Sequence, residues 1–192
     1  MLRAVLVLSL CACATPQIKK AVPGLSSRTL LINGMPLSIT LNEPTLSKDS
    51  VDRLFKKIEQ EATSIDNAFF ATGSLELNNH QLAKGKGPIS IQPMTGRMIA
   101  DAMRGYELTG GVFDPTVGPV VRAWIKMRGE QPAPSAIREA LTRVGSEKLI
   151  LSSDYKTLRT RVAGMRLEPG GLRDGWVVKH IAEVLASHRL IN

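Results

Sequence analysis

Residues 107–121 (ELTGGVFDPTVGPVV) contain the side chains in this sequence that are best suited to contact a ligand. Gly110 and Gly111 have no Cβ, so the backbone there can turn left-handed or approach another group closely. Asp114 and Thr116 place short oxygen-bearing side chains beside prolines, which fix φ and remove backbone donors. Local chemistry alone favours a plainer interpretation, a helix C-cap at Gly110 followed by a tight connection.

A second glycine-rich segment lies at residues 168–176 (EPGGLRDGW). Gly170 and Gly171 follow an expected short strand, and Gly175 lies at the start of an expected helix. In such a turn, backbone N–H groups and the helix N-terminus can face a phosphate. Turns of this kind are common in proteins that bind no ligand, so the segment alone is weak evidence.

These two segments and residues 74–78 (SLELN) resemble three motifs of one family, in the family's order. The FAD:protein FMN transferases, the ApbE family, have ELTGGxFDPTVGPLVxxWGF, DLGGIAKGY and DSELxxLN at these places, and Trp124 stands at the matching tryptophan. The similarity extends from about Leu30 to Asn192. The resemblance implies Mg²⁺-dependent transfer of FMN from FAD to a Ser or Thr of an acceptor protein, with release of AMP.

The resemblance also implies a binding site. The positions that it assigns to FAD are Asn33, Phe70, Val112, Phe113, Asp114, Glu168 and Asp174, and Gly171 would offer a backbone carbonyl to Mg²⁺. Asn33 stands where the family often has methionine, and Phe70 keeps the stacking face of the usual tyrosine without its hydroxyl. Asp174 replaces a lysine, and a carboxylate there repels phosphate unless it is paired or turned toward metal. No residue is implied as catalytic.

The first residues have the pattern of a bacterial lipoprotein signal. A charged start, Met1–Leu2–Arg3, precedes a short apolar run that is too short to span a bilayer. Leu10–Cys11–Ala12–Cys13 resembles a lipobox, in which Cys13 becomes the lipidated N-terminus. We therefore expect a signal peptide at 1–12, a linker at 13–28 and one FAD-binding domain at 29–192, anchored to a membrane and facing the periplasm or cell exterior. An ordinary signal peptide with two incidental cysteines is the alternative.

Composition limits the class of partner. The 192 residues are 43% hydrophobic and 22% charged, which is typical of one globular domain with a sizeable core. The net charge of +8 favours anionic partners such as nucleotide phosphates or an anionic lipid surface. Basic residues are scattered and aromatic residues make up only 4%, so we expect no nucleic-acid partner.

The hydrophobic pattern predicts an α+β fold, with a mixed or antiparallel sheet and packed amphipathic helices. Residues 29–41 alternate around a turn at 34–36 and predict two strands. Residues 51–69 and 94–109 repeat apolar side chains at helical spacing, with Ser47 or Ser50 as the N-cap of the first helix.

Shorter elements are expected around these. Residues 78–80 are expected to begin a loop, and Ser135 to cap a helix that ends at Val144. Three short strands at 148–151, 157–160 and 165–167 then lead into a final helix at 176–187.

The resemblance places one further part of the family after Asn192. There the family has a second strand with a glycine pair and a DxxxT segment that supplies Mg²⁺ ligands. We therefore expect an ApbE-like fold that is incomplete at the C-terminus, and transfer by these residues alone that is absent or strongly impaired. A non-catalytic FAD-binding lipoprotein or an inactive remnant is the alternative. A basic surface lipoprotein unrelated to flavin leaves residues 107–121 unexplained.

Overall fold

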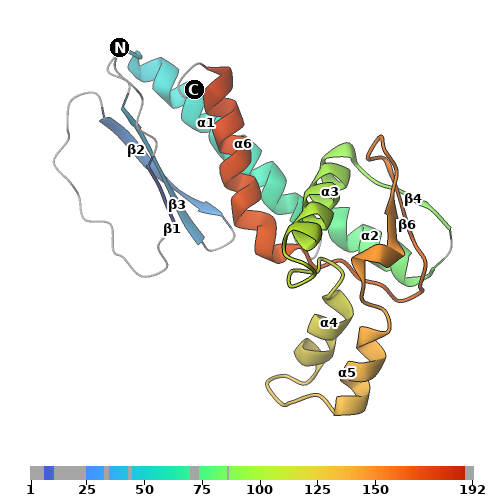
Figure 1. Ribbon diagram of the computed structural model, residues 1–192. Coiled ribbons are helices and arrows are strands. Elements are labelled where there is room, and N and C mark those ends of the chain that lie inside the picture. The colour runs from blue at the N-terminus through green and yellow to red at the C-terminus, as the bar shows by residue number, and fades with distance from the viewer. Residues whose placement is uncertain are drawn as a thin grey trace. The chain divides into compact units, whose positions relative to one another are not determined.

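The computed structural model describes residues 7–10, 25–32, 35–42, 45–69, 74–85 and 87–188. Within these residues it has six α-helices and two three-stranded antiparallel sheets, so the predicted α+β class is confirmed (Figure 1). The chain divides into two compact units: Met1–Asp66 with Asp174–Asn192, and Asn67–Arg173. The domain expected at 29–192 includes residues of both units.

The sheet of the first unit has the strand order β1-β3-β2. β2 (Leu25–Ile32) and β3 (Met35–Asn42) form the expected antiparallel strand pair, in which Ile32 pairs with Met35. β1 (Val7–Leu10) lies in the segment expected as signal peptide and pairs with β3, while β2 begins inside the expected linker. Alternation along β3 buries one face, formed by Leu37, Ile39 and Leu41.

This unit contains most of two helices. α1 (Lys48–Phe69) begins after Ser47, whose Oγ accepts the Ser50 N–H at 3.2 Å, so Ser47 is the N-cap. Its apolar face is buried as the spacing predicts, and burial of each large side chain stabilises the fold by about 1.5–3 kcal/mol. α6 (Arg173–Ser187) buries a second apolar stripe. The buried residues of the two helices are Leu54, Phe55, Ile58, Ala62, Ile65, Trp176, Val177, Ile181, Val184 and Leu185.

The second unit packs four helices with a small sheet of order β4-β6-β5. Its helices are α2 (Ser74–Ala83), α3 (Pro93–Leu108), α4 (Gly118–Lys126) and α5 (Pro134–Leu141). Its strands are β4 (Ile89–Ser90), β5 (Leu149–Leu151) and β6 (Thr157–Thr160). Two short 3₁₀ helices follow in the chain, η1 (Ser146–Lys148) before β5 and η2 (Gly170–Leu172) before α6.

Three local predictions are wrong. Residues 78–80 lie inside α2 and begin no loop, because that helix buries Asn78 and Asn79 beside Leu75 and Leu82. Ser135 is not an N-cap, because Pro134 already occupies the first turn of α5. Residues 165–167 form no strand and make only one isolated parallel bridge, between Val117 and Arg166.

The structure adds two helices that the pattern did not predict, α2 and α4, and α4 begins within the 107–121 segment, at Gly118. Pro119 occupies its first turn, where a missing N–H costs nothing. In the described part of the chain, no helix has the length and apolar character needed to cross a membrane.

Candidate functional site

The glycine pair closes helix α3 and turns the chain into an exposed loop. Gly110 and Gly111 both have positive φ, 61° and 87°, which a residue with a Cβ rarely adopts. The Phe113 N–H donates to Thr109 Oγ1 at 3.0 Å, so the C-cap residue also fixes the loop. The Val112 side chain is 91% exposed. The turn thus has the geometry of a helix end, with Thr109 as the C-cap residue, and a Cβ on Gly110 would meet nothing within 4 Å.

Asp114 fixes the C-terminal part of this loop through three hydrogen bonds. Its Oδ1 accepts the Thr116 N–H at 2.8 Å, the Thr116 hydroxyl at 2.7 Å and the Ser146 hydroxyl at 2.9 Å. Thr116 is completely buried, and its Oγ1 accepts the Gly145 N–H at 2.7 Å. One carboxylate oxygen thus joins the loop to η1, and Asp114 fixes the shape of the loop.

Phe113 brings the two glycine-rich segments together. A Cβ built on Gly105 of α3 would lie 3.2 Å from Phe113 Cδ1, and one built on Gly171 would lie 3.4 Å from Phe113 Cε2. The ring is therefore in contact with the backbone of α3 and of the Gly170–Leu172 turn. A Cβ at Gly105 would crowd the ring, whereas one at Gly171 would only reach ordinary van der Waals contact with it.

Residues 165–168 connect all three motifs. Asn79 on α2 donates through Nδ2 to the Leu167 carbonyl at 2.9 Å and accepts the Leu167 N–H through Oδ1 at 2.7 Å. The Glu168 N–H donates to the Pro115 carbonyl at 2.6 Å. Arg166 makes the parallel bridge to Val117. The segment that leads into the second glycine pair is thus held on one side by α2 and on the other by the Asp114 loop.

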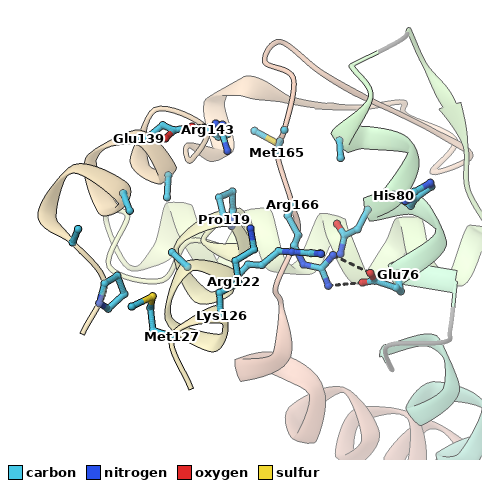
Figure 2. Close-up of a pocket in the computed structure, with 18 residues that line it drawn as sticks. Glu76, His80, Pro119, Arg122, Lys126, Met127, Glu139, Arg143, Met165 and Arg166 are labelled. Atoms are coloured by element: carbon cyan, nitrogen blue, oxygen red, sulfur yellow. Dashed lines mark hydrogen bonds and ion pairs between the residues drawn. The ribbon is translucent and has the colours of Figure 1, made fainter. Parts of the chain in front are cut away.

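An ion pair reinforces this arrangement. Arg166 Nη1 donates to Glu76 Oε1 at 3.0 Å, and Nη2 donates to Oε2, which gives a two-bond fork between residues 90 apart (Figure 2). The Arg166 guanidinium holds the pKa of the Glu76 carboxyl below its ordinary value of 4.5, although partial burial acts in the opposite direction. Gly118 packs on the same segment, and a Cβ there would meet the Arg166 carbonyl oxygen at 2.6 Å.

The structure brings together five of the residues assigned from the resemblance. Val112, Phe113 and Asp114 lie on one loop, and half-buried Glu168 and exposed Gly171 lie on the turn that Phe113 contacts. Asp174 lies in the first turn of α6 and is grouped with the first unit. The positions of Cys13, Asn33 and Phe70 lie outside the described residues.

The oxygen atoms that could coordinate Mg²⁺ lie at one turn, Gly170–Leu172, and at Glu168 just before it. The Glu168 carboxylate lies against it, because a Cβ on Gly170 would be 3.1 Å from Oε1. Mg²⁺ usually takes one or two carboxylates and completes its shell with phosphate oxygens and water. Glu168 and the Gly171 carbonyl fit part of such a shell. Across the described residues, no group of three or more His, Cys, Asp or Glu side chains is placed to hold a metal by itself.

The sequence pattern missed the residues that hold the site together. Asn79 was expected in a loop, and Arg166 and Ser146 were assigned no function. A charged residue between the apolar Met165 and Leu167 was the available signal, since such a side chain needs a partner when its neighbours are buried. The identity of that partner, Glu76, has no local signature.

Comparisons with known proteins agree with this arrangement. The sequence model of the ApbE family matches residues 33–192. The FAD:protein FMN transferase of Haemophilus influenzae is 25% identical over 171 residues, which cover 83% of this chain and 49% of that protein. The protein of the same name from Chlamydia pneumoniae is 25% identical over 181 residues, 93% of this chain and 55% of that protein. The chain thus spans about half the length of these curated relatives.

Solved structures share the fold. The ApbE protein of Thermotoga maritima superposes with a TM-score of 0.73 at 18% identity, covering 85% of this chain and 53% of that chain. The flavin transferase ApbE of Vibrio cholerae gives a TM-score of 0.70 at 20% identity, with coverage of 85% and 53%. At these identities, the likeness establishes the ApbE-like fold.

Proposed function

The chain belongs to the ApbE family, and on that premise we propose that it binds FAD and serves the transfer of FMN to a Ser or Thr of an acceptor protein. The observation that best supports the proposal is the contact of Phe113 with the Gly170–Leu172 turn. It joins the two segments to which the resemblance assigns FAD, and the links through Asn79 and Pro115 hold them in place.

Phosphate would bind at the second glycine pair. Gly170 and Gly171 are both exposed, and α6 begins after Leu172, at Arg173. Uncovered backbone N–H groups at a helix start attract anions. The flavin or adenine part would then lie along the Val112–Asp114 loop, where Val112 offers an exposed apolar side chain.

The proposed reaction is a phosphoryl-group transfer. The acceptor hydroxyl oxygen forms a bond to the phosphorus on the FMN side of FAD, the bond from that phosphorus to the bridging oxygen breaks, and AMP leaves with that oxygen. The hydroxyl proton passes to a base that we do not assign. Glu168 and the Gly171 carbonyl would hold Mg²⁺ together with pyrophosphate oxygens, and the metal supplies neutralisation of the charge that develops on phosphate.

The site of action is part of the proposal. Lipidation at Cys13 would tether the chain to a bacterial membrane, facing the periplasm or cell exterior. The acceptor would be a periplasmic or membrane-attached protein. The net charge of +8 supports this placement, since basic proteins are attracted to anionic headgroups.

Calorimetric titration of residues 14–192 with FAD and with riboflavin tests the binding step. We expect FAD to bind about tenfold or more tightly than riboflavin, because the pyrophosphate provides charge-assisted contacts that riboflavin lacks. Equal affinities for the two ligands would contradict the proposed phosphate contact. Transfer is measured separately, by in-gel flavin fluorescence of an acceptor domain after incubation with FAD and Mg²⁺, so that binding and catalysis are judged independently.

A further inference from the structure

A cavity of about 610 Å³ lies in the second unit, bordered by α2, α4, α5 and residues 164–166 (Figure 2). Its volume is within the range of small-molecule sites. Among the assigned residues that the structure describes, none of those given to FAD or Mg²⁺ by the resemblance lines it. The Val112–Asp114 loop and the Gly170–Leu172 turn thus take no part in its lining, although Glu76, Asn79 and Arg166, which hold those segments in place, also line the cavity.

The lining of this cavity has an excess of positive charge. Four cationic side chains line it: Arg122, Lys126, Arg143 and Arg166. Two anionic side chains, Glu76 and Glu139, also line it, so the net charge of the lining is +2 before any contribution from His80. Both carboxylates already have partners, Glu76 with Arg166 and Glu139 with Arg143. Arg122 attracts Glu76 from a distance, but both oxygens of that carboxylate are bonded to Arg166.

Arg122 and Lys126 supply the excess. Neither side chain makes an ion pair or side-chain hydrogen bond within the described residues. They are four residues apart on α4, so they lie on the same face of the helix, and like charges at this spacing destabilise a helix. Figure 2 draws both side chains among the residues that line the cavity. An anion held between them would remove this repulsion.

Apart from Asn79 and His80, the rest of the lining is apolar and consists mainly of alanine, proline and methionine. Ala123 of α4, Ala136 of α5 and Met165 belong to this apolar wall. Their side chains can contact a ligand and carry no hydrogen-bond donors. Such a wall favours a ligand that has an apolar body next to its charged group. Inorganic anions would leave the wall exposed to water.

We propose that this cavity binds a small organic phosphomonoester. The phosphate, which carries close to two negative charges at neutral pH, lies between Arg122 and Lys126, and the apolar body packs on the alanine and methionine wall. The charge of the ligand matches the +2 excess of the lining. The proposal does not rest on flavin transfer.

Phenyl phosphate is the test probe, measured by calorimetry at low salt on the full chain, with inorganic phosphate and benzyl alcohol as partial probes. We expect phenyl phosphate to bind about tenfold or more tightly than either, because only it uses both parts of the cavity. Arg122→Gln and Lys126→Gln should each weaken it by about tenfold. Ala136→Phe should weaken it without changing charge, by filling the apolar part.

Arg138→Gln is the matched control, because Arg138 is exposed on α5, outside the cavity lining, and the change removes the same charge. The Arg138→Gln variant should bind phenyl phosphate with the same affinity as the wild-type protein. Circular dichroism of every variant verifies folding, and Ala136→Phe keeps the test usable where a charge variant is unstable. Equal weakening by Arg138→Gln, or equal binding of inorganic phosphate, would overturn the proposal.

Saturating FAD distinguishes this cavity from the proposed flavin site. The affinity for phenyl phosphate should be unchanged in its presence. Displacement of phenyl phosphate by FAD would place the phosphomonoester at the flavin site and would refute a separate cavity. Absence of FAD binding would contradict the proposed function and leave the phenyl phosphate result valid.

Discussion

Asn79 and Leu167, 88 residues apart in the chain, exchange two hydrogen bonds, of 2.9 Å and 2.7 Å. The amide of Asn79 thus replaces the neighbouring strand that the Leu167 backbone lacks, and it fixes the segment that enters the second glycine pair. The site therefore depends on a polar side chain that is only 2% exposed.

Asn79→Ala should lower the free energy of unfolding by about 2–4 kcal/mol, because it leaves the buried N–H and C=O of Leu167 without partners. Chemical denaturation followed by circular dichroism measures the change. Gln81→Ala, an exposed position on the same helix, is the control and should change stability by about 0.5 kcal/mol or less. Similar losses in the two variants would show that the pair with Leu167 contributes little.

Gly118→Ala should destabilise the protein by about 1–3 kcal/mol or more, because the new methyl would lie 2.6 Å from the Arg166 carbonyl oxygen and 2.9 Å from the Arg166 carbonyl carbon. Gly175→Ala is the control, since a Cβ at that position of α6 meets nothing within 4 Å. It should stabilise by about 0.5–1 kcal/mol, as Gly to Ala does in a helix. A tolerated Gly118→Ala would mean that α4 does not pack as closely on Arg166 as the structure has it.

Asp114→Ala should weaken FAD binding by about tenfold or more, because it removes the three hydrogen bonds that shape the loop. Asp114→Asn keeps an acceptor oxygen, so FAD binding should be weakened less in this variant than in Asp114→Ala. Lys57→Ala, on the exposed face of α1, removes a charge elsewhere and should leave the dissociation constant unchanged. Equal effects of Asp114→Ala and Lys57→Ala would argue against a role of this loop in FAD binding.

The Glu76–Arg166 pair predicts an acid-sensitive stability. Because the pKa of Glu76 is lowered in the folded state, the unfolded chain binds more protons below pH 4.5, so the contribution of the pair is present above that pH. It is lost as the pH falls through the lowered pKa of the folded protein. Unfolding free energies measured from pH 7 downward should therefore decline less steeply for Glu76→Gln than for wild type. Exposed Glu59→Gln should follow the wild-type curve, and a wild-type slope in Glu76→Gln would contradict the linkage.

Lipidation of Cys13 predicts that labelled fatty acid enters the wild-type protein in bacterial cells and does not enter Cys13→Ser. Cys11→Ser is the control and should label normally, since Cys11 belongs to the removed signal. One acyl chain holds a protein weakly, so stable membrane attachment should require more than one. Label in Cys13→Ser at the wild-type level would refute the anchor.

The sequence by itself determined the elements whose pattern is local. The β2–β3 hairpin follows from alternation, α1 and α3 from apolar spacing, and the turn at Gly110 and Gly111 from the freedom of glycine to take positive φ. The order of the motifs indicated the family, which the match over residues 33–192 establishes.

Only the tertiary structure decided what holds these motifs together. α2 buries two asparagines on its inner face, so its pattern is not that of an amphipathic helix, and its place depends on Leu167. Glu76 and Arg166 meet across 90 residues, and α4 and α5 border a cavity with an unbalanced charge. Such pairings depend on which distant groups the chain brings together, and no local propensity or spacing encodes the partner of a side chain.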